Sequence, residues 1–331
     1  MNPYVFLVGC PRSGTTLLSR IANAHPQLAV VHETRWIPRT FEFRRGLTQE
    51  GFITPKLLER MRDPLRLKRL AIDEEELARL FENDERVPFA NFVTRLFDRY
   101  GERQGKRLVG DKSPGYVRYL SLLHELWPQS KFVHIIRDGR DVCLSVLEWR
   151  KGVTSFSTFD EDPFTTMGVW WEWYVQLGRE GGRQLGPGLY HELRYESLVA
   201  EPEPESARLC DLLGIPYHAS MLRFHEGRTS SKPGLSAKAA WLPVTGGLRD
   251  WRTQMDSADV LRFEAAAGDL LDELGYPRGA PSISRRQREQ AARIRERFAE
   301  QAHSRQRPVP RAWSNGTDGA SKGSLAEAGS G

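Results

Sequence analysis

The first 25 residues hold the pattern that restricts the possible folds most. An apolar, β-prone run at residues 4–8 leads into the loop Gly9-Cys-Pro-Arg-Ser-Gly-Thr-Thr16, and residues 17–25 then show helical spacing. The loop nearly matches the phosphate-binding pattern G-x-x-x-x-G-K-[ST], in which backbone N–H groups at a helix N-terminus hold an anion. This order predicts the start of an α/β fold with an anion-binding loop, and a plain tight turn is the alternative.

One position of the loop departs from the phosphate-binding pattern. Thr15 stands where that pattern has the lysine that reaches the β- and γ-phosphates of a triphosphate, which argues against hydrolysis of ATP or GTP. Arg12 supplies a charge inside the loop instead, and its planar guanidinium can bind an oxyanion through two hydrogen bonds. We expect the anion to contact Arg12, Ser13, Gly14, Thr15 and Thr16.

The rest of the chain alternates short β-prone runs with helical segments. Such alternation predicts a P-loop-type parallel sheet flanked by helices. Residues 35–105 are expected to form several helices with breaks at Pro55, Pro64 and Pro88, as helical insertions that form a lid over the sheet. Further strands are predicted at 107–110, 131–137 and 189–195, and helices at 115–127, from Asp138, and at 163–184, 203–213 and 257–274.

Positive charge is concentrated near the C-terminus. The whole chain has a net charge of +5, but residues 278–311 carry ten Arg and three Glu. The body of the chain is therefore almost neutral, and the basicity belongs to an appendage rather than to a nucleic-acid groove. We predict a main domain at 1–277, an Arg-rich helical extension at 278–303, through which a homodimer could form, and a disordered tail at 304–331.

Several protein classes are disfavoured by composition. No apolar run approaches the roughly 20 residues of a membrane span, and no basic segment precedes the apolar run at residues 4–8. Cys10, Cys143 and Cys210 are too few and too scattered for a disulfide framework or a zinc site. We expect a cytoplasmic protein with no membrane span and no metal. The aromatic stripe at residues 170–174 is interpreted as core.

A second motif combines a strand-like run with an arginine and a serine. Arg137 follows Phe132-Val-His-Ile-Ile, and Ser145 stands eight residues later in the predicted helix. Arg137 is thus expected at the carboxyl end of a strand, where open α/β sheets bind ligands. A surface ion pair of Arg137 with Asp138 or Asp141 is the alternative.

Together the two motifs resemble the sulfotransferases that use 3′-phosphoadenosine 5′-phosphosulfate (PAPS). Residues 11–16 are similar to their 5′-phosphosulfate loop, and Arg137 and Ser145 to the pair that holds the 3′-phosphate. The resemblance covers roughly residues 4–277 and implies that this range is a sulfotransferase domain, with PAPS as co-substrate and no metal. It implies transfer of a sulfuryl group to an acceptor hydroxyl by in-line displacement.

Within that superfamily, the chain is most similar to the tyrosylprotein sulfotransferases and their bacterial relatives. The run His32-Glu33-Thr-Arg35-Trp-Ile-Pro-Arg39 resembles the stretch that carries their catalytic base. The resemblance implies that Glu33 takes the proton of the acceptor and that Arg35 and Arg39 bind the acceptor. A carboxylate within reach of the acceptor hydroxyl is a reasonable general base.

Two further pieces extend the resemblance. Gly110-Asp-Lys112-Ser-Pro is similar to the segment with the catalytic lysine, and Arg194-Tyr195-Glu-Ser-Leu-Val to a tyrosine motif near the adenine. In that scheme Lys112 and Arg12 neutralise the leaving phosphate, while Tyr195 contacts the nucleotide.

Alternatives stay open for three of these roles. Glu33 could instead be the ion-pair partner of Arg35 or Arg39, and His32 could be the base, as histidine is in cytosolic family members. Lys112 could be a solvated turn residue.

The sequence also departs from the family in its C-terminal third. A lysine expected ahead of residue 243 is Leu242 here, and Lys232 or Lys238 could replace it, with Ser236 as a weaker candidate for a phosphate contact. Residues 246–251 resemble the Gly…Trp segment of the superfamily without its paired basic residues. Nucleotide contacts from this region are therefore the least defined part of the predicted site.

The sequence supports a sulfotransferase that acts on a small-molecule or peptide hydroxyl. A small-molecule kinase with a degenerate P-loop is one alternative, disfavoured by the missing lysine, and a non-catalytic nucleotide-binding relative is another. Phenol, peptide tyrosine, sugar and lipid acceptors all remain open, because function does not follow from fold alone. No nucleic-acid partner is expected.

Overall fold

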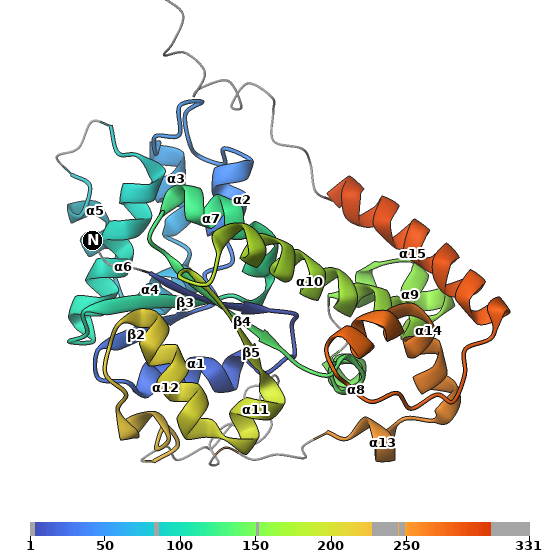
Figure 1. Cartoon of the computed structure of the whole chain (residues 1–331). Helices are drawn as coiled ribbons and strands as arrows, with labels where there is room; N and C mark the ends of the chain where they lie inside the picture. Colours follow the sequence, from blue (N-terminus) through green and yellow to red (C-terminus); the bar gives the residue numbers. More distant parts are fainter. Residues whose placement is uncertain (1–3, 83–85, 150–151, 227–243, 245–248, 306–331) are drawn as a thin grey trace, which may run out of the picture.

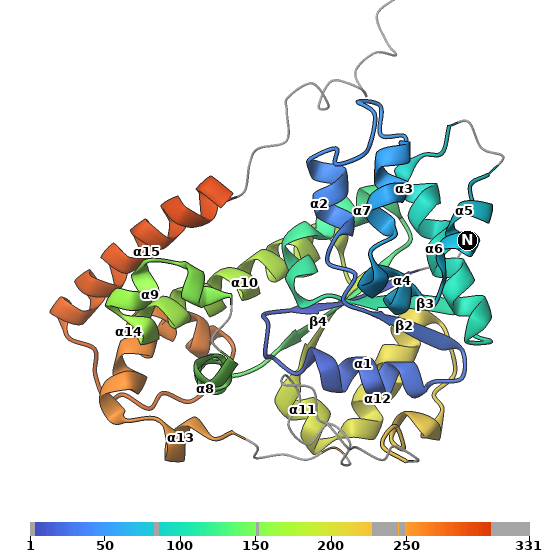
Figure 2. The ribbon, with the colours of Figure 1, turned by 180° about the vertical axis from the view of Figure 1, so that it is seen from behind.

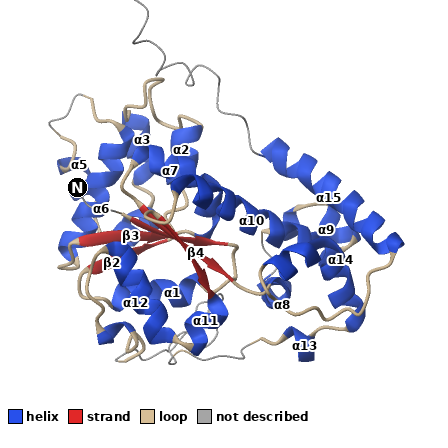
Figure 3. Ribbon diagram, viewed as in Figure 1, coloured by secondary structure: helices blue, strands red, loops and turns tan. Residues whose placement is uncertain are grey.

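The computed structural model describes residues 4–82, 86–149, 152–226, 244 and 249–305. Within them, five strands form one sheet in which every neighbouring pair is parallel (Figure 3). The order across the sheet is β2-β3-β1-β4-β5, so the predicted α/β class and parallel sheet are confirmed. The strands are β1 (Val5–Gly9), β2 (Leu28–His32), β3 (Leu108–Lys112), β4 (Lys131–Ile136) and β5 (Tyr190–Arg194).

Both faces of the sheet are covered by helices (Figures 1 and 2). All residues of β1 are buried, which explains why this strand is one apolar run instead of an alternating one. Its side chains still alternate between two cores, with Phe6 and Val8 in one and Val5 and Leu7 in the other. The first core includes α6 (Phe89–Arg103), α7 (Leu120–Leu126) and α10 (Pro163–Leu185), and the second includes α1 (Thr15–Ala24), α11 (Tyr195–Ala200) and α12 (Pro202–Leu213).

Short helices lie over the β2–β3 side of the sheet, above it in Figure 1. They are α2 (Ile37–Glu42), α3 (Pro55–Met61), α4 (Pro64–Leu70) and α5 (Glu74–Arg79), followed by α6. Pro55 and Pro64 are the first residues of their helices, and Pro88 directly precedes α6. The predicted breaks are thus helix starts, because proline at the first helical position loses no hydrogen bond. That these helices act as a lid stays a prediction.

Several described elements differ from the sequence prediction, including the short helices Thr158–Glu161, Tyr195–Ala200 and Trp251–Gln254, which were not predicted. Strand β2 was not predicted, although its length of five residues equals that of β1, β3 and β5, which were predicted. The helix expected at 115–127 begins as a 3₁₀ helix (Pro114–Tyr119) and becomes α-helical only in α7. Further 3₁₀ turns are Val153–Ser155 and Ala219–Met221.

A second group of helices lies beside the sheet and is joined to it by the long α10 (Figure 1). Its members are α8 (Gly139–Trp149), α9 (Thr158–Glu161), α13 (Trp251–Gln254), α14 (Ser257–Glu273) and α15 (Arg285–Arg305). The aromatic residues Trp170, Trp171 and Tyr174 of α10 are buried in the core, as predicted.

The Arg-rich segment is helix α15, and its apolar side packs on the same chain. Ala291, Ile294, Phe298 and Ala302 are buried at helical spacing, and α15 contacts α10 and α14. A homodimer and the three-part division of the chain stay predictions, and residues 306–331 of the predicted tail lie outside the described part. Within the described part, every helix is too short or too polar to cross a membrane.

Candidate active site

The predicted site residues meet at one edge of the sheet. Each strand ends at or just before one of them, and the carboxyl ends of parallel strands lie together. In sheet order these residues are Glu33 after β2, Lys112 in β3, Arg12 after β1, Arg137 after β4 and Tyr195 after β5.

The loop at residues 9–16 has the geometry of an anion cradle. Gly14 caps α1 in the left-handed region (φ 98°), and Arg12 also has a positive φ of 79°. A Cβ on Gly14 would lie 2.4 Å from the ring of Tyr195, so only glycine fits here. The hydroxyl of Ser13 is buried without a partner among the described residues. This hydroxyl and the first N–H groups of α1 are available to an anion.

A hydrogen bond links the two motifs that the sequence places 133 residues apart. Nε of Arg12 donates to Oγ of Ser145 over 2.8 Å, and Ser145 is buried on α8. Burial lowers the pKa of the Arg12 guanidinium, and the charges of Arg249 and Arg137 lower it further. The loop and α8 therefore form a single positively charged site.

Arg137 is buried and held by two contacts. Its Nη2 donates to Oδ2 of Asp141 over 3.2 Å, and its guanidinium carbon lies 4.2 Å from the ring centre of Tyr195. The ion pair with Asp141 was one of the alternatives, but it is buried rather than on the surface. Nε of Arg137 has no partner among the described residues. The contacts orient the guanidinium and leave one buried donor for a ligand.

Lys112 and Glu33 form an ion pair between neighbouring strands. Nζ of Lys112 donates to Oε1 of Glu33 over 2.6 Å, and the N–H of Glu33 donates to the carbonyl oxygen of Lys112. Only 1% of the Lys112 side chain is exposed, so the alternative of a solvated turn residue is wrong. Burial lowers the pKa of Lys112 to about 7, with Asp111 opposing the change and Arg35 adding to it.

The backbone of Glu33 is held in an unusual conformation. Glu33 (φ 55°) and Arg35 (φ 57°) lie in the left-handed region, as does Arg12 in the neighbouring loop. Such conformations cost energy for non-glycine residues and are frequent at functional sites. Nη1 of Arg69 on α4 donates to the carbonyl oxygen of Glu33 over 2.8 Å and stabilises this turn. Arg69 was not predicted, because nothing in the sequence of α4 signals a contact 36 residues away.

The remaining predicted acceptor-side residues have different surroundings. Arg35 forms an ion pair with the second carboxylate oxygen of Glu33, as one alternative had it. Arg39 is exposed on α2, and the structure does not bring it to Glu33. Desolvation and the charges of Lys112 and Arg69 lower the pKa of His32 to about 4, so this ring is neutral near pH 7.

The predicted C-terminal contribution to the site is not tested by the part of the chain that the structure describes. Lys232, Lys238, Leu242 and Ser236 lie outside the described residues. Within the described residues, Arg249 lies against α8, and its Nη2 donates to Oε2 of Glu148 over 2.7 Å.

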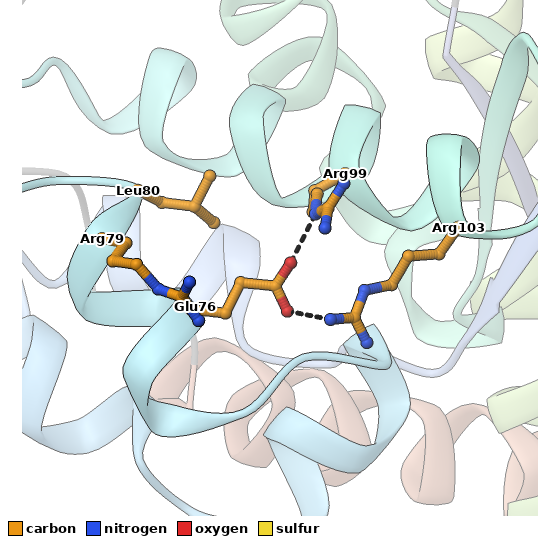
Figure 4. A pocket seen from close by; sticks show the side chains of 5 residues that line it. All are labelled: Glu76, Arg79, Leu80, Arg99 and Arg103. Atoms are coloured by element: carbon orange, nitrogen blue, oxygen red, sulfur yellow. Dashed lines mark hydrogen bonds and ion pairs between the residues drawn. The ribbon is translucent and has the colours of Figure 1, made fainter.

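A pocket of about 280 Å³ lies apart from these residues, on α5 and α6. Figure 4 shows Arg99 and Arg103 directed at the two carboxylate oxygens of Glu76, with which both form ion pairs. The arginines are therefore compensated within the chain. Its lining is Glu76, Arg79, Leu80, Arg99 and Arg103, and includes no predicted site residue. No group of three or more His, Cys, Asp or Glu residues suited to a metal occurs in the described part.

Comparison with known proteins decides the family. The model described as "Sulfotransferase family" matches residues 3–219. The chain belongs to the sulfotransferase family. The resemblance predicted from the two motifs is thus confirmed, and so is the enzyme class at the level of the family.

Individual relatives of this family member agree with that assignment. The Drosophila melanogaster protein-tyrosine sulfotransferase is 28% identical over 281 residues, which are 83% of this chain and 52% of the fly protein. The Gallus gallus protein-tyrosine sulfotransferase 2 is 27% identical over 281 residues, 83% of this chain and 69% of the chicken protein. The chain thus spans about half to two thirds of these relatives.

A solved structure shows the same fold. The sulfotransferase domain from the curacin biosynthetic pathway aligns with a TM-score of 0.53 at 20% identity, and covers 90% of this chain and 98% of that domain.

Proposed function

We propose that this chain transfers the sulfuryl group of PAPS to an acceptor hydroxyl, with Glu33 as the general base. The observation that carries the proposal is the Glu33–Lys112 pair, a carboxylate and a buried ammonium 2.6 Å apart at the ends of β2 and β3. The loop with Arg12 follows β1, which is the next strand in the sheet after β3. Base and anion cradle are therefore neighbours. Family membership supports this reaction class.

The donor side of the site fits a nucleotide with anionic groups at two ends. Ser13 and Arg137 each offer a buried donor without a partner among the described residues. Residues 12–16 would hold the 5′-phosphosulfate, Arg137 and Ser145 the 3′-phosphate, and Tyr195 would lie near the adenine. When bound, PAPS supplies the sulfuryl group and a phosphate as the leaving group.

The residues of the chain supply positioning and charge. Glu33 accepts the proton of the acceptor hydroxyl as that oxygen bonds to sulfur and the bond from sulfur to the phosphate oxygen breaks. Lys112 and Arg12 neutralise the negative charge that collects on the departing phosphate. Because all three groups are fixed at strand ends, little reorganisation is needed.

Glu33 must become available before it can act. Both of its carboxylate oxygens are bonded, one to Lys112 and one to Arg35. The Arg35 side chain is 63% exposed, so this contact is the cheaper one to break, whereas Lys112 is buried. We infer that Arg35 turns from Glu33 to the acceptor when the acceptor binds. A small-molecule or peptide hydroxyl is the proposed acceptor, and the curated relatives are named for protein tyrosine.

The test replaces the base without changing its shape. Glu33→Gln is expected to reduce turnover by roughly 10²–10⁴-fold and to leave nucleotide binding nearly unchanged. Turnover is measured with isotopically labelled PAPS against phenols, sugars, sterols and tyrosine peptides, and binding of the product nucleotide (PAP) by calorimetry. Undiminished turnover would show that Glu33 is not the base.

The matched control is His32→Gln, which should retain turnover. A loss of turnover in His32→Gln but not in Glu33→Gln would show that His32 is the general base. Phosphoryl transfer from ATP with magnesium by the unaltered chain would instead support the kinase alternative.

A further inference from the structure

The turn that carries Glu33 is bound to one other segment of the chain. This turn, residues 33–37, connects β2 to α2, and the other segment, residues 111–116, ends β3 and begins the 3₁₀ helix that follows it. Four backbone N–H groups of the turn donate to residues 111–116. The pairs are Glu33 with the carbonyl oxygen of Lys112 (2.9 Å), Thr34 with Oδ2 of Asp111 (3.2 Å), Arg35 with Oγ of Ser113 (3.4 Å) and Ile37 with the hydroxyl of Tyr116 (3.2 Å).

Three of these four acceptors belong to side chains, and all three side chains are buried. They are Asp111, Ser113 and Tyr116. The hydroxyl of Tyr116 makes a second contact, a hydrogen bond of 2.6 Å with the hydroxyl of the buried Thr34. Because water does not reach these groups freely, an N–H group of the turn that lost its acceptor would stay unpaired, which is costly for a buried donor. The side chains of residues 111–116 therefore hold the turn in one conformation.

The turn needs this support because its backbone is strained. Glu33 and Arg35 have φ values of 55° and 57°, and a residue with a Cβ keeps the left-handed conformation only where the surrounding contacts impose it. Lys112 belongs to β3, which is paired on both sides, whereas Glu33 lies one residue beyond the end of β2. If the turn relaxed, the carboxylate of Glu33 would move relative to Lys112. The geometry of this ion pair thus depends on the side chains that hold the turn.

Among the residues that hold the turn, Tyr116 acts on it most selectively. Asp111 also influences the catalytic lysine, because its charge raises the pKa of Lys112. The hydroxyl of Tyr116 instead bonds only to the turn, through Thr34 and Ile37. Within the described residues, no hydrogen bond or ion pair joins Tyr116 to the anion-binding loop or to Arg137. Loss of this hydroxyl should therefore disturb the turn and leave the nucleotide side of the site intact.

We propose that Tyr116 is a positioning residue, which holds the turn through Thr34 and Ile37 so that Glu33 is placed for proton transfer. The assignment rests on the proposed function, in which Glu33 is the general base. Tyr116 acts through the backbone of the turn, since both carboxylate oxygens of Glu33 are bonded elsewhere. Proton transfer depends steeply on the distance and direction between base and hydroxyl, so a small shift of the carboxylate is enough to slow turnover.

The experiment removes single hydroxyl groups and measures turnover and nucleotide binding separately. Tyr116→Phe is expected to lower kcat roughly 10- to 100-fold and to change PAP affinity, measured by calorimetry, less than about threefold. Thr34→Val should lower kcat in the same way, and Thr34→Ser should recover most of that loss because it restores a hydroxyl. The matched control is Tyr119→Phe, a tyrosine of the same 3₁₀ helix whose hydroxyl makes no hydrogen bond among the described residues, and it should keep its kcat.

A second measurement separates positioning of the base from a purely structural role. Tyr116→Phe is combined with Glu33→Gln, and kcat is measured with labelled PAPS and the acceptor that gives the highest rate in the panel of phenols, sugars, sterols and tyrosine peptides. If Tyr116 acts through Glu33, the second substitution should cause no further loss, because a side chain that cannot accept the proton gains nothing from its position. A structural role would lower kcat by the same factor in both backgrounds.

The possible contrary results have different consequences. Unchanged kcat in Tyr116→Phe, an equal loss in both backgrounds, or a parallel loss of PAP affinity would overturn the assignment of Tyr116 and leave the proposed function standing. Undiminished turnover in Glu33→Gln would overturn Glu33 as the base, and the assignment of Tyr116 with it.

Discussion

The molecule contains two arginine-rich regions of opposite character. In the first region, three arginines from distant parts of the chain contact side chains of α8. They are Arg12, Arg137 and Arg249. In α15 the arginines follow one another in sequence, and residues such as Arg285 stand in solvent with 93% of the side chain exposed. Charge density in the sequence points to the second region, whereas the buried arginines lie in the first, where water screens their charge weakly.

The two regions also differ in whether their arginines have ion-pair or hydrogen-bond partners. In α15, Arg285 pairs with Glu289 of the same helix, and Arg297 pairs with Glu161 of α9. In the region that contacts α8, the buried Nε atoms of Arg137 and Arg249 have no hydrogen-bond partner among the described residues. An arginine that is compensated by its own chain needs no further partner, while a buried donor without an acceptor is a candidate for ligand binding.

The largest expected effect concerns the buried ion-pair network of Arg140. Arg140 is fully buried and forms ion pairs with Asp138 and Glu264. Arg140→Ala would leave the buried Asp138 without its ion-pair partner and Glu264 with the more distant Arg278, so we expect a loss of about 3–5 kcal/mol in the free energy of unfolding. Urea denaturation measures this quantity. A loss below about 1 kcal/mol would mean that the network is not what holds this region together.

The next effect concerns ligand binding by an arginine of the first region. Arg137→Ala should weaken nucleotide binding by about 2–5 kcal/mol, because it removes one partner of a buried charged pair. Calorimetry with analogues that carry or lack a 3′-phosphate measures the loss. Equal losses for both analogues would refute the assigned role of Arg137.

The smallest expected effect lies in α15. Arg297→Ala removes an ion pair with Glu161 in which both side chains are about half exposed, so the free energy of unfolding should change by less than about 0.5 kcal/mol. Nucleotide binding should not change. A loss of more than about 1 kcal/mol would show that the exposed arginines of α15 are as important as the buried ones, and the contrast between the regions would fail.

Most of the fold was accessible from local patterns. The runs at residues 131–137 and 189–195 were recognised as strands, and they are β4 and β5 with small shifts of their ends. Strand β2 was not recognised, although β1, β3 and β5 have the same five-residue length and were, so its length does not explain the omission. Pro55 and Pro64 were located correctly but were interpreted as breaks, when each begins a helix.

The site was accessible in part. Arg12, Arg137 and Ser145 were found because they stand at fixed positions after predicted strands, and the structure brings them to one edge of the sheet. Arg69 was not found, since it comes from a segment without a motif, and Arg249 was not singled out although it lies in the segment that resembles the Gly…Trp motif. The burial of Lys112 also had no signal in sequence, because it depends on the strands and helices packed around β3.

The sequence by itself determined most of the order of strands and helices and the polar residues at four of the strand ends, because periodicity and loop residues act over a few neighbouring positions. Only the tertiary structure decided which of the charged residues are buried and which partners they have. The physical reason is that the energy of a charge depends on the dielectric and on groups within a few ångströms, and those groups can come from distant segments, as with Arg12 and Ser145, which are 133 residues apart.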